Sequence, residues 1–214
     1  SVGKVGLGLL LAVFLNQKLK TQNFLRTVYF APCVLNNIAV GVLFAAMMHP
    51  TTGLINKILH HIGLGFLAQN WLTDPKLAIY SVASIEIWKW TGFTMVILLA
   101  GLQVIPTDYY EAAAIDGATE WQKFKSITIP LLMPALTNSI VVNLIGGLKV
   151  FDMIYATTQG GPGNATEVLN SYMFKSFGQG RYGEASASSV ILSIIVAVVV
   201  VSSYSILTKQ EVEL

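Results

Sequence analysis

The chain has 214 residues, of which 54% are apolar and only 11% carry a charged side chain. An ordinary soluble domain has roughly 25% charged residues, so a soluble fold could not cover its surface with this composition. The net charge of +2 is small and scattered, which argues against a nucleic-acid-binding surface. A single cysteine excludes an internal disulfide framework.

Apolar segments recur along the chain at lengths that suit membrane-spanning helices. The first, residues 5–15, is too short to cross a hydrocarbon core of about 30 Å, and the chain opens without a methionine, so we expect a truncated amino end. Residues 28–48 and 188–207 are uncharged and long enough to span, and residues 78–103 and 131–155 are long and apolar despite a few ionisable residues. The sequence therefore predicts an all-α, polytopic transmembrane helical bundle with about five spans.

Basic residues in the connections predict the orientation of these spans. Lys18, Lys20 and Arg26 crowd the first short loop, which the positive-inside rule assigns to the cytoplasm. Alternation then makes residues 104–130 a cytoplasmic loop. The same alternation makes 49–77 and 157–187 external loops within a single transmembrane domain of residues 1–214.

The cytoplasmic loop carries the most specific local signals in the chain. Asp108 followed by Glu111 predicts a capped first helix, which Gly117 can end in the left-handed conformation. Thr119 then opens a T-x-x-Q capping box for a second short helix. This chemistry suits either a docking element or an amphipathic hairpin that anchors to lipid headgroups.

The residues of this loop closely resemble the E-A-A loop of ABC importer permeases. The fuller pattern E-A-A-x-x-D-G-A is similar to the carbohydrate-uptake branch of that family, as are residues 151–155 and 158–162 further on. Members of the family usually carry one span more than this chain shows. They insert the first short helix of the loop into a cleft on the ATPase subunit. The resemblance therefore implies an ATPase-coupling role for Glu111, Ala112, Ala113, Asp116, Gly117, Ile127 and Pro130.

The same resemblance implies a multi-pass permease subunit of the bacterial cytoplasmic (inner) membrane. It would move a carbohydrate delivered by an extracytoplasmic solute-binding protein, together with a second permease subunit and two ATPase subunits. The chain contains no P-loop pattern, so ATP and Mg would bind the ATPase partner, and we expect no cofactor, metal or catalytic residue here. A polyol or glycerol phosphate is an alternative solute. An ATP-independent channel or carrier and a membrane-embedded enzyme are alternative classes that leave the E-A-A loop unexplained.

Ionisable residues inside an apolar segment predict one face of a solute pathway. Glu86, Lys89, Trp90 and Phe93 fall at positions i, i+3, i+4 and i+7, so a carboxylate and two aromatic rings share one helical face. Sugars are bound by such groups, because hydroxyls need polar partners and C–H faces lie against rings. Glu86 and Lys89 could instead simply neutralise each other.

A facing set of pathway residues is implied by the resemblance. Counting back from the Gly-Gly-Pro segment at 160–162 gives the corresponding positions on the neighbouring span. For the glycines among them, close helix packing explains their presence at least as well as a place in the pathway. These positions are Asn143, Gly146, Gly147 and Val150. Lys149 and Asp152 are expected to form a charge pair near the outer end of that span.

Overall fold

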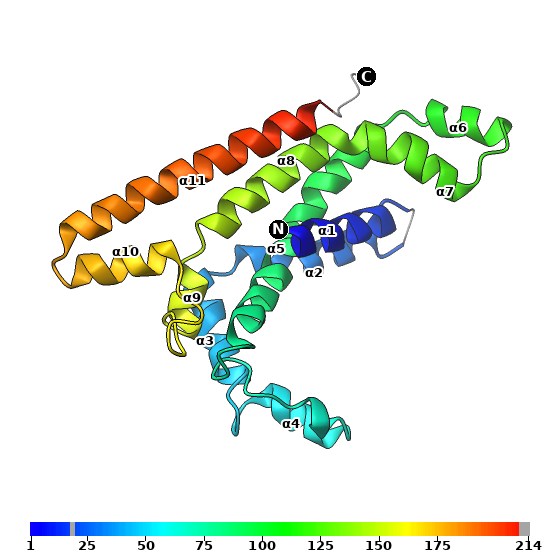
Figure 1. Ribbon diagram of the computed structural model, residues 1–214. Coiled ribbons are helices and arrows are strands. Elements are labelled where there is room, and N and C mark those ends of the chain that lie inside the picture. The colour runs from blue at the N-terminus through cyan, green and yellow to red at the C-terminus, as the bar shows by residue number, and fades with distance from the viewer. Residues whose placement is uncertain (18–19, 210–214) are drawn as a thin grey trace. The chain divides into compact units, whose positions relative to one another are not determined.

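The computed structural model describes residues 1–17 and 20–209, and no strand occurs in these ranges. Lys18, which contributes to the predicted orientation, lies outside the described residues. The helices group into two compact units. Figure 1 shows the helices coloured along the chain, from blue at α1 to red at α11. The first unit combines Ser1–Cys33, Trp90–Gly147 and the segment from Ala197. The second combines Val34–Lys89 and Leu148–Val196.

The first unit has a core built from three apolar helices that are distant in sequence. Fully buried side chains from α1, α5 and α8 meet there, among them Leu15, Met95, Leu98 and Leu132. The predicted cytoplasmic loop extends from this core. The helices of this unit are α1 (Val2–Leu15), α2 (Gln22–Val34), the second half of α5 (Ala78–Val104), α6 (Asp108–Ile115), α7 (Glu120–Lys123), the π-helical segment η2 (Phe124–Thr128) and α8 (Ile129–Leu148).

The second unit has its own core, in which α3, the first half of α5 and α9 meet. Val40, Ile85, Met153 and Ile154 are each at most 2% exposed. In Figure 1 the yellow α9 lies against the blue α3. The helices of this unit are α3 (Asn37–Met47), α4 (Leu54–His61), the 3-10 turn η1 (Gly65–Leu67), α9 (Asp152–Thr157), α10 (Leu169–Gly178) and most of α11 (Tyr182–Thr208).

One polar side chain holds together the predicted external loop 49–77. Asn56 is 6% exposed, and its amide group donates to the carbonyl oxygens of Pro50 and Gln69, at 3.0 Å each. The indole of Trp71 donates to the Asn56 side-chain oxygen at 2.8 Å. A single buried side-chain amide therefore links the segments before and after α4 by hydrogen bonds to both.

The all-α prediction is confirmed, and three described helices are long and apolar enough to cross a membrane. They are α5, the continuous helical run Glu120–Leu148 and α11. α2 and α3 together would form a fourth span, but only as a bent pair. α1 has 14 residues, which corresponds to about 21 Å and is shorter than a full span.

The predicted span over residues 28–48 is interrupted in the structure. α2 ends at Val34, two residues after Pro32, and α3 begins at Asn37. Asn36 has extended backbone angles (φ −62°, ψ 135°), and its side-chain oxygen accepts from the backbone amides of Ile38 and Ala39. A helix stop followed by a strong N-cap therefore divides an apolar segment that composition alone reads as continuous.

The expected span over residues 131–155 also ends earlier, because α8 stops at Leu148 and α9 begins separately at Asp152. The predicted charge pair between Lys149 and Asp152 is not formed. Asp152 instead accepts a hydrogen bond from the side-chain amide of Asn37 at 3.1 Å, while the backbone oxygen of Lys149 accepts from Asn170 at 2.7 Å.

Helix packing in the first unit requires glycine at residue 92. A Cβ atom there would overlap the carbonyl oxygen of Tyr29 on α2. We expect Gly92→Ala to destabilise the protein by about 1–3 kcal/mol through overpacking, and to lower its melting temperature in detergent by several degrees. Gly146→Ala is the matched control, because nothing lies within 4 Å of a Cβ at that position. Equal melting temperatures for the two variants would contradict the close approach of α2 and α5.

Candidate functional site

The predicted coupling loop is a helical hairpin with a sharp turn at Gly117. The amides of Gly117 and Ala118 donate to the carbonyl oxygens of Ala114 and Ala113 at 3.1 and 2.9 Å, which closes the end of α6. Gly117 has φ +77°, and nothing lies within 4 Å of a Cβ built on it. Glycine is therefore required here for its left-handed backbone and not for space.

The second arm of the hairpin begins with the predicted capping box. The Thr119 side chain accepts from the amide of Gln122, and the Gln122 side chain accepts from the amide of Thr119. The arm begins with the expected short helix α7 (Glu120–Lys123), but this helix does not end before the span. Residues Glu120–Leu148 form one helical run of 29 residues, which passes through the π-helical turn η2 into α8. The loop is thus continuous with a membrane span.

The predicted cap at the start of the first arm is wrong. Thr107 occupies the N-cap position of α6 and makes no side-chain capping bond, so Asp108 lies inside the first turn. Asp108 and Glu111 are both acidic residues of that turn, where the partial positive charge of a helix amino end favours carboxylates. Their contribution is therefore electrostatic.

The two arms are held together by side chains close to the membrane end of the hairpin. The hydroxyl groups of Tyr110 on α6 and Thr128 on η2 are 2.9 Å apart, and Thr128 is buried. On the second arm the rings of Trp121 and Phe124 stack with centroids 5.8 Å apart. The hairpin is therefore a built element whose arms are linked by a hydrogen bond.

The hairpin brings together four of the seven predicted coupling residues. Ala113, Asp116, Gly117 and Ile127 line one open pocket of about 350 Å³ between the arms. Glu111 and Ala112 are exposed on α6, and Pro130 is half-buried near the start of α8. Ile115, at the end of α6, is 87% exposed, an apolar side chain that lacks cover in this chain. An exposed apolar tip on an ordered loop is typical of a protein-docking surface.

The predicted pathway residues of the first unit lie on α5 and α8. The rings of Trp90 and Phe93 meet edge to face with centroids 5.9 Å apart. Asn143 is 5% exposed, and its amide donates to the Thr94 hydroxyl at 3.0 Å and to the Ser139 carbonyl at 2.9 Å. Its hydrogen bonds therefore join α8 to α5. Sequence reasoning missed Thr94, because a threonine in an apolar helix is an ordinary residue until its partner is known.

The remaining pathway positions differ in their surroundings. A Cβ atom added to Gly146 would have no neighbour within 4 Å, whereas one added to Gly147 would lie 3.5 Å from the Ser1 hydroxyl oxygen. In the second unit Glu86 is half-buried, and Val150 is half-buried against the core of that unit. Lys89 is only 1% exposed, and its ammonium group donates to the carbonyl oxygen of Leu35 at 2.7 Å. The described residues contain no group of three or more His, Cys, Asp or Glu that could hold a metal ion.

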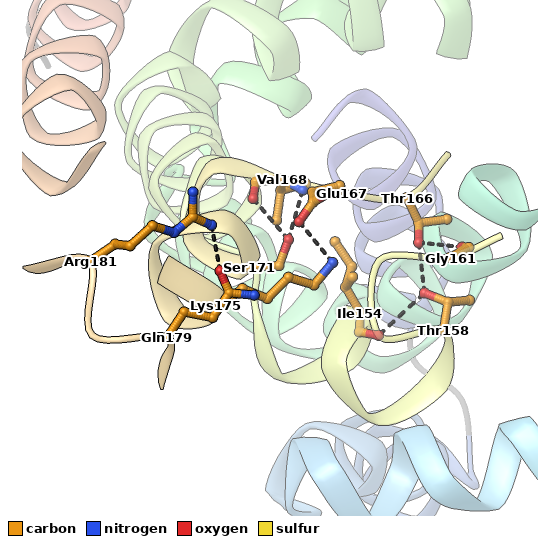
Figure 2. A network of polar contacts seen from close by, with 10 residues as sticks. All are labelled: Ile154, Thr158, Gly161, Thr166, Glu167, Val168, Ser171, Lys175, Gln179 and Arg181. Atoms are coloured by element: carbon orange, nitrogen blue, oxygen red, sulfur yellow. Dashed lines mark hydrogen bonds and ion pairs between the residues drawn. The ribbon is translucent and has the colours of Figure 1, made fainter. Parts of the chain in front are cut away.

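A network of polar contacts orders the predicted external loop 157–187 (Figure 2). The hydroxyls of Thr158 and Thr166 are 2.7 Å apart, and Thr166 donates to the carbonyl oxygen of Gly161 at 2.7 Å. Further along, Lys175 and Glu167 form an ion pair of 2.8 Å. Thr166 is fully buried, and its hydroxyl group is hydrogen-bonded, so this part of the loop is held by buried polar contacts.

The apolar spans are those of an integral membrane protein, and comparison with known proteins places it in a family. Residues 4–211 match the family described as binding-protein-dependent transport system inner membrane component. The chain belongs to this family, which consists of transport components and not of enzymes. The resemblance drawn from the E-A-A loop is therefore confirmed.

Individual relatives have the same character. The trehalose/maltose transport system permease protein MalF of Thermococcus litoralis is 40% identical over 190 residues, 89% of this chain and 64% of that protein. The multiple sugar-binding transport system permease protein MsmF of Streptococcus mutans is 35% identical over 215 residues, 99% of this chain and 72% of that protein. This chain thus spans about two thirds of the length of such relatives.

Solved structures of a bacterial ABC transporter for alginate share the fold. One superposes with a TM-score of 0.84 and 28% identity, covering 95% of this chain and 72% of that chain. A second, in complex with an alginate pentasaccharide-bound periplasmic protein, superposes with a TM-score of 0.82 and 28% identity, covering 93% and 70% of the two chains. The helices described above therefore form an ABC permease fold.

The turn at Gly117 allows a test of the hairpin. We expect Gly117→Val to weaken binding of the ATPase subunit about tenfold, because a left-handed conformation is strongly disfavoured for a β-branched residue. Gly117→Asn is the matched control, since asparagine tolerates this conformation, and we expect it to bind within about threefold of the native protein. Co-purification and titration of the ATPase subunit measure both variants. Equal binding of Val and Asn variants would show that the turn is not required for docking.

Proposed function

We propose that this chain is the permease subunit of a carbohydrate importer in the bacterial cytoplasmic membrane. A solute-binding protein outside the membrane delivers the carbohydrate, and a second permease subunit completes the pathway. ATP and Mg bind to two separate ATPase subunits. The observation that carries the proposal is the exposed E-A-A hairpin, four of whose seven predicted coupling residues line one pocket beside a continuous helical run.

The shape of the hairpin supports a mechanical role in coupling. An exposed apolar side chain, Ile115, stands at the end of α6, next to the open pocket of the hairpin. The second arm runs without interruption from Glu120 to Leu148. A displacement of the hairpin by the ATPase would thus reach the membrane through one helical run, which includes the π-helical segment η2 and Pro134.

The carbohydrate substrate is supported by the relatives and by one aromatic cluster. The relatives described above carry trehalose, maltose, other sugars or alginate in their names. In this chain the Trp90 and Phe93 rings form an edge-to-face pair on α5. An aromatic surface of this kind can pack against the C–H face of a sugar.

The partner outside the membrane is supported by the external loop. The network around Thr158 and Thr166 holds residues 158–167 in a defined conformation, and Lys175 ties Glu167 to α10. An ordered loop can form a specific contact without a large loss of conformational entropy. The alginate transporter structure contains a periplasmic protein, which agrees with a binding-protein partner.

The coupling role is tested with Glu111. Glu111→Lys places a positive charge in the first turn of α6, next to the positive end of the helix dipole. We expect uptake and solute-stimulated ATP hydrolysis to fall together by about three- to thirtyfold, while ligand affinity of the binding protein is unchanged. Glu111→Gln, which keeps the shape, should lose less. The reconstituted complex is assayed with and without loaded binding protein. Normal stimulation in Glu111→Lys would return the hairpin to a lipid-anchoring role.

The solute pathway is tested with two tryptophans of the same helix. Trp90→Ala removes a proposed stacking surface, and we expect the KM of uptake to rise about fivefold. Trp88→Ala is the matched control, because Trp88 is 45% exposed and packs on Phe44 instead. We expect its KM to stay within about twofold of the native value. A comparable increase of KM in both variants would mean that Trp90 acts through helix packing and does not contact the solute.

A further inference from the structure

The interruption between α2 and α3 creates two helix ends inside an apolar segment. α2 ends at Val34 and α3 begins at Asn37, so Leu35 and Asn36 lie outside both helices. Helix ends leave backbone groups without partners in the helix, and in hydrocarbon no water can replace them. An uncharged apolar sequence in a membrane would by default form one continuous helix. The interruption therefore needs support from elsewhere in the protein.

Lys89 supplies part of this support at the carboxyl end of α2. Its ammonium group donates to the Leu35 carbonyl oxygen at 2.7 Å, and the residue is 1% exposed. Carbonyl groups accumulate partial negative charge at a helix carboxyl end, so a cation there is stabilising. A lysine in the middle of a long apolar helix is costly unless such groups face it. The broken helix thus offers a physical reason for the position of Lys89.

Asp152 occupies the corresponding place at the amino end of α3. Its carboxylate accepts from the side-chain amide of Asn37, the first residue of α3, at 3.1 Å. The amino end of a helix carries a partial positive charge, so an anion there is stabilising. The carboxylate is held in place because α9 packs closely on α3. A Cβ atom added to Gly41 of α3 would lie only 2.5 Å from the Cβ of Ala156 on α9.

We propose that Lys89 and Asp152 are positioning residues that keep this span broken, each matching the dipole of one half-helix. Lys89 then affects the rate of transport through the shape of the span and does not bind the solute. The three contacts involved, those of Asn36, Lys89 and Asp152, all lie within the second unit. This inference rests on the proposed function only for its transport readout.

The native cysteine reports on the break without any transport assay. Cys33 is the one cysteine of the chain, half-buried in the last turn of α2. We expect Lys89→Met to release the Leu35 carbonyl oxygen and so to loosen the last turn of α2, which raises the rate of Cys33 alkylation by a small maleimide about tenfold in proteoliposomes without solute. Lys89→Arg keeps the cation and should remain within about twofold of the native rate. Lys57→Met, which removes an exposed cation of α4, controls for a general effect of changing charge and should leave the rate within about twofold of the native value.

Uptake kinetics then separate positioning from solute binding. We expect Lys89→Met to lower the maximal rate about tenfold with KM within about threefold, and Lys89→Arg to restore most of the rate. A raised KM with unchanged Cys33 reactivity would instead show that Lys89 contacts the solute. Unchanged uptake kinetics together with unchanged Cys33 reactivity would show that Lys89 has no positioning role. If Lys89→Met does not insert, Lys89→Gln is read by the same criteria. A Cys33 response in a complex that imports no carbohydrate would overturn the proposed function and leave the positioning role intact.

Discussion

The structure depends on one constraint, which is that backbone polar groups in hydrocarbon must find partners within the protein. This constraint makes every long apolar segment helical and explains why the departures from helix are few and specifically supported. At the break before α3, Asn36 accepts from two backbone amides. Lys89 donates to a carbonyl oxygen at the same break. The turn between α6 and α7 lies in the loop, and there Gly117 and Thr119 close the two helix ends.

Association of the helices follows from the same environment. Lipid tails are as apolar as leucine, so helices in a membrane associate through close packing and hydrogen bonds more than through the hydrophobic effect. Small residues permit this approach at several points: a Cβ on Gly8 would lie 2.6 Å from the Thr94 side chain, and Gly41 faces Ala156. The bond from Asn143 to Thr94 adds a buried polar link between α8 and α5. Positions that resemble pathway residues in sequence can thus be packing residues in the fold.

The proposed coupling role places two demands on the hairpin. It would need to be exposed to meet a partner and ordered enough to transmit a displacement. Its tip is therefore apolar and uncovered at Ile115, while Tyr110 and Thr128 link its arms nearer to the membrane. Because α7, η2 and α8 are continuous, the second arm of the hairpin and the span belong to one helical run.

The sequence by itself determined the features that depend on neighbouring residues. Apolar runs indicated the membrane class, the E-A-A pattern indicated the family, and Gly117 and Thr119 indicated the turn of the hairpin, because each of these signals lies within one continuous stretch of sequence. Only the tertiary structure decided the break at Asn36 and the partners of the charged residues. Lys89 and Leu35 are 54 residues apart, and Asn37 and Asp152 are 115 apart. A charge within a span gives no local sign of its partner, since that partner is brought near only when the helices pack.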